Sequence, residues 1–203
     1  MIAMIDGAGL PAAAGLGASL RTWRALRRVK QAHAAELLGV NQATISRWES
    51  GAERPSARQA ARLRELMAAA PASDADRALA SLVRESGEAV HMICDLTHRL
   101  LAVSRPRTRR WGVSGAQLIG CSLWRYATDD IVAAEEGLAD AGWFEPAAPA
   151  RRVFTRANRS SEVPIRAGWM TWTRLRLSDG GYARLVRDDR PAAREPAPTC
   201  SGP

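Results

Sequence analysis

Residues 39–51 bring together polar side chains that can hydrogen-bond to the edges of nucleic-acid bases. Asn41 predicts the start of a helix, because its side-chain oxygen can accept a hydrogen bond from a free amide in the first helical turn. Ile45 and Trp48 lie three residues apart and share one face, which packs inward. The side chains left for the outer face are Gln42, Ala43, Thr44, Ser46 and Arg47. Such amide, hydroxyl and guanidinium groups read base edges in the major groove of DNA.

A helix this short is not stable alone in water, so neighbouring helices must hold it in place. The sequence predicts one such helix from Ser19 and a second over residues 31–38, which Gly39 ends. A further helix begins after Ser56, a suitable N-cap. The apolar positions of the first and last helices are Leu20, Trp23 and Leu26, and Ala60, Leu63, Leu66 and Met67. These four short helices predict a compact all-α domain over residues 18–70.

Spaced positions in this domain resemble the lambda-repressor-like, Xre/Cro-type family of helix-turn-helix DNA-binding domains. The matching positions are Leu20, Arg24, Gln31, residues 37–40, residues 43–49, Gly51, Pro55 and Ser56. The resemblance implies that the helix from Gln42 lies in the major groove of a double-stranded DNA operator. The residues that it implies at the DNA are Gln31, Asn41, Gln42, Ala43, Thr44, Ser46, Arg47 and Arg54. Gln31 is expected to bond a phosphate, and Ser46 and Arg54 are expected near the DNA backbone.

The same resemblance pairs Arg24 of the first helix with Glu49 at the end of the third, where the pair would brace the recognition helix. The alternative is an exposed ion pair worth less than about 1 kcal/mol. Residues 30–33 depart from the family pattern, which more often has a small polar residue before the glutamine. That difference affects a phosphate contact and not the fold.

Basic side chains are concentrated in the same segment. The whole chain has a formal net charge of +8, and Lys30 is its only lysine. Residues 20–70 carry ten basic and four acidic side chains, as expected of a surface that neutralises phosphates. Because an arginine bias often reflects codon composition, the position of the charge counts for more than its total.

The apolar pattern changes its period in the second half of the chain. A connector helix is predicted within residues 71–87, either as a linker or as a dimer contact. Strands are predicted over residues 89–94, 99–104, 151–158, 165–177 and 182–187, and helices over residues 114–119 and 128–141. Residues 105–110 are predicted as a basic loop, and residues 178–181 as the turn of a hairpin.

This order of elements over residues 88–188 resembles the PAS fold, as do Asp95, residues 99–104 and residues 118–123. The resemblance implies an α+β PAS-like domain with an antiparallel sheet. Domains of this family bind a small molecule or cofactor between sheet and helices, or serve only to dimerise. The expected fold is therefore an all-α helix-turn-helix domain of four to five short helices followed by this domain. Residues 1–17 and 189–203 are expected to be disordered.

Several residues of the second half are candidate cofactor ligands. His91 or His98 as a haem ligand is disfavoured, because His98 lies in a predicted turn and His91 fills the sheet. Cys121 lacks the neighbours of a flavin photoadduct site. Trp111, Trp124, Trp143, Trp169 and Trp172 either line an aromatic pocket or form the core, and the core is favoured. We expect no cofactor and no metal site.

Neither catalysis nor a membrane span is indicated by the sequence. No nucleophile has a base at a suitable spacing, and no carboxylates or metal ligands cluster, so we expect no enzyme. The cysteines, Cys94, Cys121 and Cys200, have no paired spacing and indicate a reducing compartment. No apolar run is long enough to span a membrane, and no export signal is evident, so a cytoplasmic location is expected.

These observations predict a sequence-specific DNA-binding transcriptional regulator whose second domain dimerises or senses a ligand. One small helix-turn-helix domain offers little interface, so a homodimer on two half-sites is the natural route to useful affinity. The alternative is a ligand- or cofactor-binding sensor that acts mainly through protein interaction. A third reading, an enzyme with a DNA-targeting module, lacks a catalytic constellation.

Overall fold

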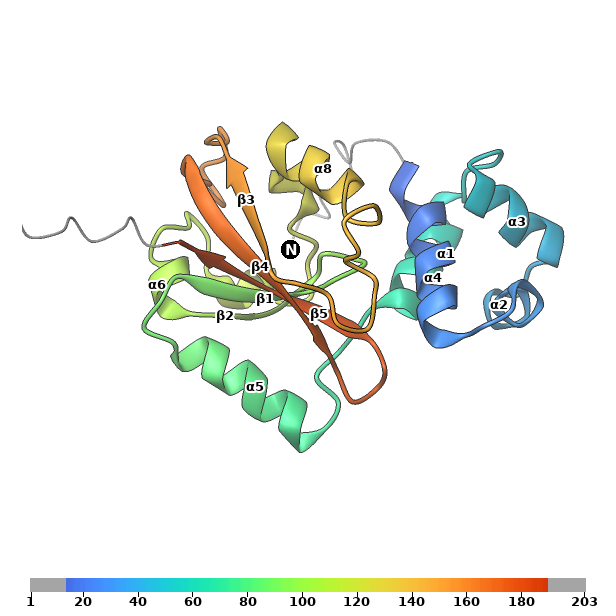
Figure 1. The fold of residues 1–203 in the computed structure, drawn as a ribbon, viewed down its shortest axis with the longest axis horizontal. Helices are drawn as coiled ribbons and strands as arrows, with labels where there is room; N and C mark the ends of the chain where they lie inside the picture. The colour runs from blue at the N-terminus through green and yellow to red at the C-terminus, as the bar shows by residue number, and fades with distance from the viewer. Residues whose placement is uncertain (1–13, 190–203) are drawn as a thin grey trace, which may run out of the picture.

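Five helices precede a five-stranded sheet along the chain (Figure 1). A computed structural model describes residues 14–189, so the tail beyond residue 189 and most of the N-terminus expected to be disordered lie outside the described residues. The helices are α1 (Ala14–Arg27), α2 (Gln31–Leu38), α3 (Gln42–Ser50), α4 (Ala57–Met67) and α5 (Asp74–Glu85). No helix within the described range is long and apolar enough to cross a membrane.

Helix α1 begins at Ala14, five residues before the predicted start at Ser19. The alanines and glycines of this segment read as low complexity, but one of them, Gly17, lies at a helix contact. Gly17 is buried and lies so close to α3 that a methyl group there would collide with the carbonyl oxygen of Trp48. The predicted disorder of residues 14–17 is therefore wrong, because small residues let α1 approach the backbone of α3.

Helices α1 to α4 share one apolar core. Its buried members are Leu20, Trp23, Ala35, Leu38, Ile45, Trp48, Leu63 and Met67. Ile45 and Leu63 are fully buried at its centre. Figure 1 shows α3 on the side of this helical domain away from the sheet. The face of α3 opposite its core residues is thus open to a large ligand.

The strands form one antiparallel sheet in the order β2-β1-β5-β4-β3. They are β1 (Val90–Cys94), β2 (Leu100–Val103), β3 (Arg151–Thr155), β4 (Gly168–Arg176) and β5 (Tyr182–Asp188). The predicted hairpin joins β4 to β5, and Gly180 in its turn has a φ of 78°. The predicted fold class, a helical domain followed by an α+β domain with an antiparallel sheet, is confirmed.

Some predicted bounds in this domain differ from the structure. Strand β3 ends at Thr155 rather than at residue 158, and β4 begins at Gly168 rather than at residue 165. The predicted basic loop contains a short helix, α6 (Arg105–Thr108), because the hydroxyl of Ser104 accepts a hydrogen bond from the amide of Arg107. Two further short elements are α7 (Gly115–Leu118) and η1 (Trp124–Tyr126).

Helix α8 (Asp129–Glu136) is shorter than the predicted helix over residues 128–141. Gly137 ends it, and the chain continues in turns toward Trp143. The predicted cap is present, since the hydroxyl of Thr128 accepts a hydrogen bond from the amide of Ile131 at 3.2 Å. The predicted helix was expected to end at Gly142, five residues beyond Gly137.

Each face of the sheet has its own core. Helix α5 covers one face through Ala80 and Val83, which pack with Met92, Cys94 and Ala183 of the strands. The connector helix is thus part of the second domain's packing. The other face carries Ile93, Leu100, Val153, Met170, Trp172 and Val186, and α8 and the segment around Trp143 lie over it. A cavity remains on this second face.

Candidate functional site

Both ends of α3 are held by the residues that sequence reasoning named. The Oδ1 atom of Asn41 accepts hydrogen bonds from the amide of Thr44 at 2.8 Å and from its hydroxyl at 2.9 Å. Gly39, with a φ of 65°, ends α2 just before this cap, and Gly51, with a φ of 76°, ends α3. Ile45 and Trp48 anchor the inner face in the core. The helix is therefore held at a single orientation.

The outer face of α3 consists of Gln42, Ala43, Ser46 and Arg47, all exposed. Thr44 is placed differently from the prediction: it is 9% exposed, and its hydroxyl is engaged with Asn41. Arg47 reaches Glu53 through an exposed ion pair of 2.8 Å. Arg54 is exposed in the turn that follows α3. The surface offered to a ligand is therefore an amide, a methyl, a hydroxyl and a guanidinium.

Arg24 and Glu49 form a bidentate ion pair that joins α1 to the end of α3. The Nε atom of Arg24 lies 2.6 Å from Oε1 of Glu49, and its Nη2 lies 2.7 Å from Oε2. The Glu49 side chain is only 2% exposed. Burial alone would raise the pKa of Glu49, but the hydrogen bonds from Arg24 and Gln31 lower it below its ordinary value. The carboxylate is thus held charged at neutral pH, and its ion pair with Arg24 fixes the end of α3 against α1.

Gln31 also contacts this ion pair, because one N–H of its Nε2 donates a hydrogen bond to Oε2 of Glu49 at 2.9 Å. A glutamine amide has two N–H groups, so the second stays available for a phosphate. Arg21 also joins the cluster, donating to the backbone carbonyl of Glu49 at 2.7 Å. Sequence reasoning missed this contact. The helical position of Arg21, three residues before Arg24, was the available signal.

Removing Arg24 tests this bracing. We expect Arg24→Ala to lower the free energy of unfolding by about 1.5–3 kcal/mol, because a buried carboxylate loses two charged hydrogen bonds. Urea unfolding followed by circular dichroism measures the change. Arg58→Ala is the control, because Arg58 is exposed on α4 and forms no ion pair within the described range. Equal stability of the two variants would contradict a structural role for the pair.

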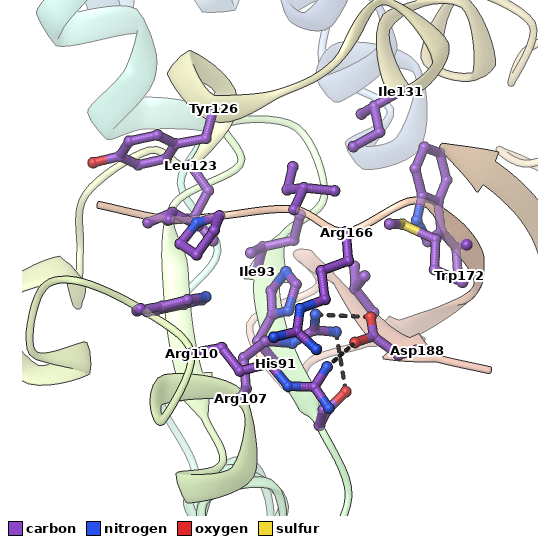
Figure 2. A pocket seen from close by; sticks show the side chains of 18 of the residues that line it. His91, Ile93, Arg107, Arg110, Leu123, Tyr126, Ile131, Arg166, Trp172 and Asp188 are labelled. Carbon is purple, nitrogen blue, oxygen red and sulfur yellow. Dashed lines mark hydrogen bonds and ion pairs between the residues drawn. The ribbon is translucent and has the colours of Figure 1, made fainter. Parts of the chain in front are cut away.

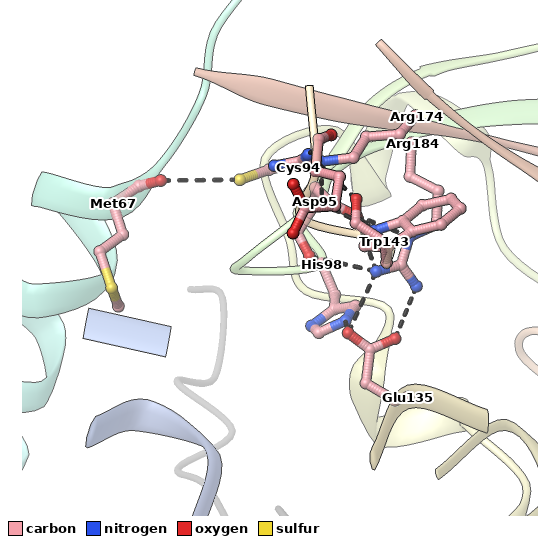
Figure 3. Close-up of polar contacts among 9 residues, drawn as sticks. Met67, Cys94, Asp95, His98, Glu135, Trp143, Arg174 and Arg184 are labelled. Atoms are coloured by element: carbon pink, nitrogen blue, oxygen red, sulfur yellow. Dashed lines mark hydrogen bonds and ion pairs between the residues drawn. The ribbon is translucent and has the colours of Figure 1, made fainter. Parts of the chain in front are cut away.

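A buried ion network occupies one end of the second domain, as Figure 3 shows. The side chain of Asp95, 0% exposed, lies 2.7 Å from Nη2 of Arg184 and 3.1 Å from Nε of Arg174. Trp143 donates its Nε1–H to both oxygens of Asp95 at 3.1 Å. Arg184 also lies 2.6 Å from Glu135. The two guanidinium groups and the two carboxylates balance one another in charge.

His98 extends the network, with its Nε2 atom 3.1 Å from Glu135. Burial raises the pKa of Glu135, but the charge of Arg184 and the hydrogen bond with His98 outweigh it and lower the pKa to about 2. Sequence reasoning missed this network. The available signal was a charged side chain at inward positions of two strands, since Arg174 and Arg184 lie two residues from Trp172 and Val186 and so share their face of the sheet.

The depressed pKa of Glu135 makes stability depend on pH. An ordinary carboxyl titrates near 4.5, so the stabilisation is complete above that pH and is lost as the pH falls toward about 2. We expect a loss on the order of 3 kcal/mol across this window. Urea unfolding at pH 6 and at pH 2 measures it, and Glu135→Gln should remove this part of the pH dependence. An unchanged pH profile in that variant would contradict the assignment.

A cavity of about 480 Å³ lies between the sheet and the segments that cover it, as Figure 2 shows. Its polar end holds His91, Arg107, Arg110, Arg166 and Asp188. Its other walls include Ile93, Leu123, Tyr126, Ile131 and Trp172. The volume falls within the range of small-molecule sites, about 300–1,000 Å³. Within residues 14–189 no group of three or more His, Cys, Asp or Glu side chains is placed to hold a metal ion.

The tryptophans are divided between core and cavity. Trp143 is fully buried in the core, and Trp172 is 2% exposed and belongs both to the core and to the cavity wall. Trp111, Trp124 and Trp169 also line the cavity. Some of the tryptophans therefore form the core and others line the cavity, so each of the two interpretations holds for part of the set.

Residues 15–80 match the family model of a helix-turn-helix domain. Helices α1 to α4 form that domain. No curated protein matches the chain. One similar solved structure is the PAS domain of an HTR-like protein from Haloarcula marismortui, at 12% identity and a TM-score of 0.35, over 57% of this chain and 96% of that one. Another is an RNA-binding light-oxygen-voltage receptor, at 12% identity and a TM-score of 0.37, over 86% of this chain and 57% of the receptor.

The end of α4 and the residues just after it contact the second domain. The Sγ atom of Cys94 accepts a hydrogen bond from the amide of Ala69 at 3.3 Å, just after α4. Arg99 lies 2.5 Å from Glu65 of α4. Leu96 packs against the core of the helix-turn-helix domain. Because Cys94 precedes Asp95 directly, the buried ion network and the junction between the domains share one stretch of chain.

Proposed function

We propose that this protein is a sequence-specific DNA-binding transcriptional regulator of the Xre/Cro type that works in the cytoplasm. The observation that carries the proposal is the outer face of α3. Gln42, Ala43, Ser46 and Arg47 are exposed together on a helix whose two ends and inner face are fixed. A preorganised helix with these groups can enter a major groove at little entropic cost.

Groups around α3 supply the expected phosphate contacts. Gln31 keeps one amide N–H free, and Ser46 and Arg54 are both exposed. Asn41 and Thr44 act in this proposal mainly through the cap that orients the helix. The excess of basic side chains over residues 20–70 adds attraction to the duplex that does not depend on sequence.

The second domain is proposed as the dimerising and sensing part. It exposes Leu82 on α5, at 67%, and Phe154 and Trp169 on β3 and β4, at 45% and 49%. The two aromatic rings lie 5.5 Å apart in an edge-to-face arrangement. Exposed apolar groups of this size often mark a protein contact, and a second copy of the chain is the partner that a two-half-site operator requires.

The cavity favours a second candidate function, a sensor that acts mainly through ligand-dependent protein interaction. Its volume and its mixture of apolar walls with a few polar groups are those of a small-molecule site. An absorbance spectrum of freshly purified protein tests one form of this alternative, a sensor that holds a light-absorbing cofactor. A Soret or flavin band would support a cofactor-based sensor, and a spectrum of tryptophan alone would not.

Selection of bound sequences from random duplex DNA tests the proposed function with the full-length protein. We expect recovery of an inverted repeat whose half-sites lie about one helical turn apart, roughly 10 base pairs. Recovery of no preferred sequence would contradict sequence-specific reading. Recovery of a single half-site would support the reading of DNA by α3 and contradict binding as a dimer.

A further inference from the structure

We infer that the cavity of the PAS-like domain binds an amphipathic organic acid, a molecule with an apolar body and one anionic head. This inference rests on the proposed role of the domain as a sensor and names the chemical class of its ligand. It follows from the way charge and apolar surface are separated along the cavity walls.

Three guanidinium groups converge on the polar end of the cavity, as Figure 2 shows. Arg107 lies 2.7 Å from Asp188 and also donates to the carbonyl oxygen of Ala89 at 3.0 Å. Arg110 reaches the same carboxylate only at 3.4 Å. Arg166 forms no ion pair within the part of the chain that the structure describes. One carboxylate thus faces three guanidinium groups.

The other acidic residues that line the cavity pair with other arginines. Asp189 lies 2.7 Å from Arg152 and accepts the hydroxyl of Thr171 at 2.6 Å. Glu88 lies 3.8 Å from Arg187. The guanidinium of Arg184 is bound by Asp95 and Glu135. The polar end therefore keeps an excess of positive charge, which an anionic head would neutralise.

His91 adds a neutral polar group at the same end. Burial lowers its pKa well below 6.5, and the charge of Arg107 lowers it further, so the imidazole is uncharged at pH 7. Its Nδ1 atom and the Nε atom of Arg107 are both buried without a hydrogen-bond partner. Buried polar atoms without partners are rare in proteins and often mark the place of a missing group. Both residues line the polar end of the cavity, where the head of a bound molecule would sit.

The rest of the wall is suited to an apolar body. Ile93 and Trp172 come from the sheet, and Leu123 and Ile131 come from the segments above it. None of these four side chains carries a charge. A ligand with only an apolar body would leave the guanidinium groups unsatisfied, and a small inorganic anion would leave the apolar walls unfilled. The two ends together specify a molecule with both parts.

Isothermal titration calorimetry with decanoate and 1-decanol tests the inference, because these probes share an apolar chain and differ in the anionic head. The full-length protein is compared with Arg110→Gln/Arg166→Gln. The control is Arg105→Gln/Arg109→Gln, which removes two charges from exposed residues that do not line the cavity. Thermal melting of all three proteins checks that each is folded.

We expect decanoate to bind the unmodified protein and the control at least tenfold more tightly than 1-decanol. The Arg110→Gln/Arg166→Gln variant should lose decanoate affinity by about tenfold to hundredfold, with its affinity for 1-decanol unchanged. Equal affinities for the two probes, no binding of either, or an unaltered decanoate affinity in the variant would each overturn the inference. DNA selection with the same preparation reports separately on the proposed function.

Discussion

Asp95→Ala is expected to lower the free energy of unfolding of the second domain by about 3–5 kcal/mol. The substitution leaves Arg184 and Arg174, whose side chains are 2% and 3% exposed, without their shared carboxylate. It also removes the acceptor of the Trp143 indole N–H. Unpaired charges in a low-dielectric interior are costly, so the loss exceeds that of an ordinary surface change. Urea unfolding followed by tryptophan fluorescence measures it.

Asp140→Ala is the matched control, because Asp140 is exposed in the turns after α8. Its expected effect lies within about 0.5 kcal/mol. If Asp95→Ala were no more destabilising than Asp140→Ala, the network would not hold the domain together. Because both variants remove one carboxylate, a difference in stability between them reflects the buried contacts of Asp95 and not the change in net charge.

Gln42→Ala/Arg47→Ala has the second large expected effect, on operator binding. Each base contact contributes about 1–3 kcal/mol, so the double variant should bind the selected operator about 2–6 kcal/mol more weakly. Both side chains are exposed, and neither belongs to the core, so the unfolding curve should stay within about 0.5 kcal/mol of the unmodified protein. A gel-shift titration at fixed salt measures the affinity. Unchanged affinity in a folded double variant would contradict the assignment of the reading face.

Much of the helix-turn-helix domain was predictable because its signals are local. Asn41 as a cap, Gly39 and Gly51 as helix ends, and the three-residue spacing of Ile45 and Trp48 all act within one or two turns. The inward turn of Thr44 was not predictable in this way. Its spacing places it near the outer face, but the cap oxygen of Asn41 holds its hydroxyl.

Several features of the second domain could not be predicted from the sequence. The hairpin turn of residues 178–181 is encoded locally and was found. The two arginine partners of Asp95 lie 79 and 89 residues away in sequence, and the pairing of β1 with β5 and of β5 with β4 brings them together. The guanidinium groups at the cavity were also missed, because residues 105–110 read as a solvated basic loop. Their convergence depends on how α6 packs at the end of the sheet.

The reading of DNA by α3 is tested most directly by comparing the sequences that the unmodified protein and Arg47→Ala select from random duplex DNA. Arg58→Ala serves as the charge-matched control away from the reading face. The account predicts that Arg47→Ala loses preference at one position in each half-site, with the other positions and the control motif unchanged. An Arg47→Ala motif identical to that of the unmodified protein, at equal affinity, would contradict it.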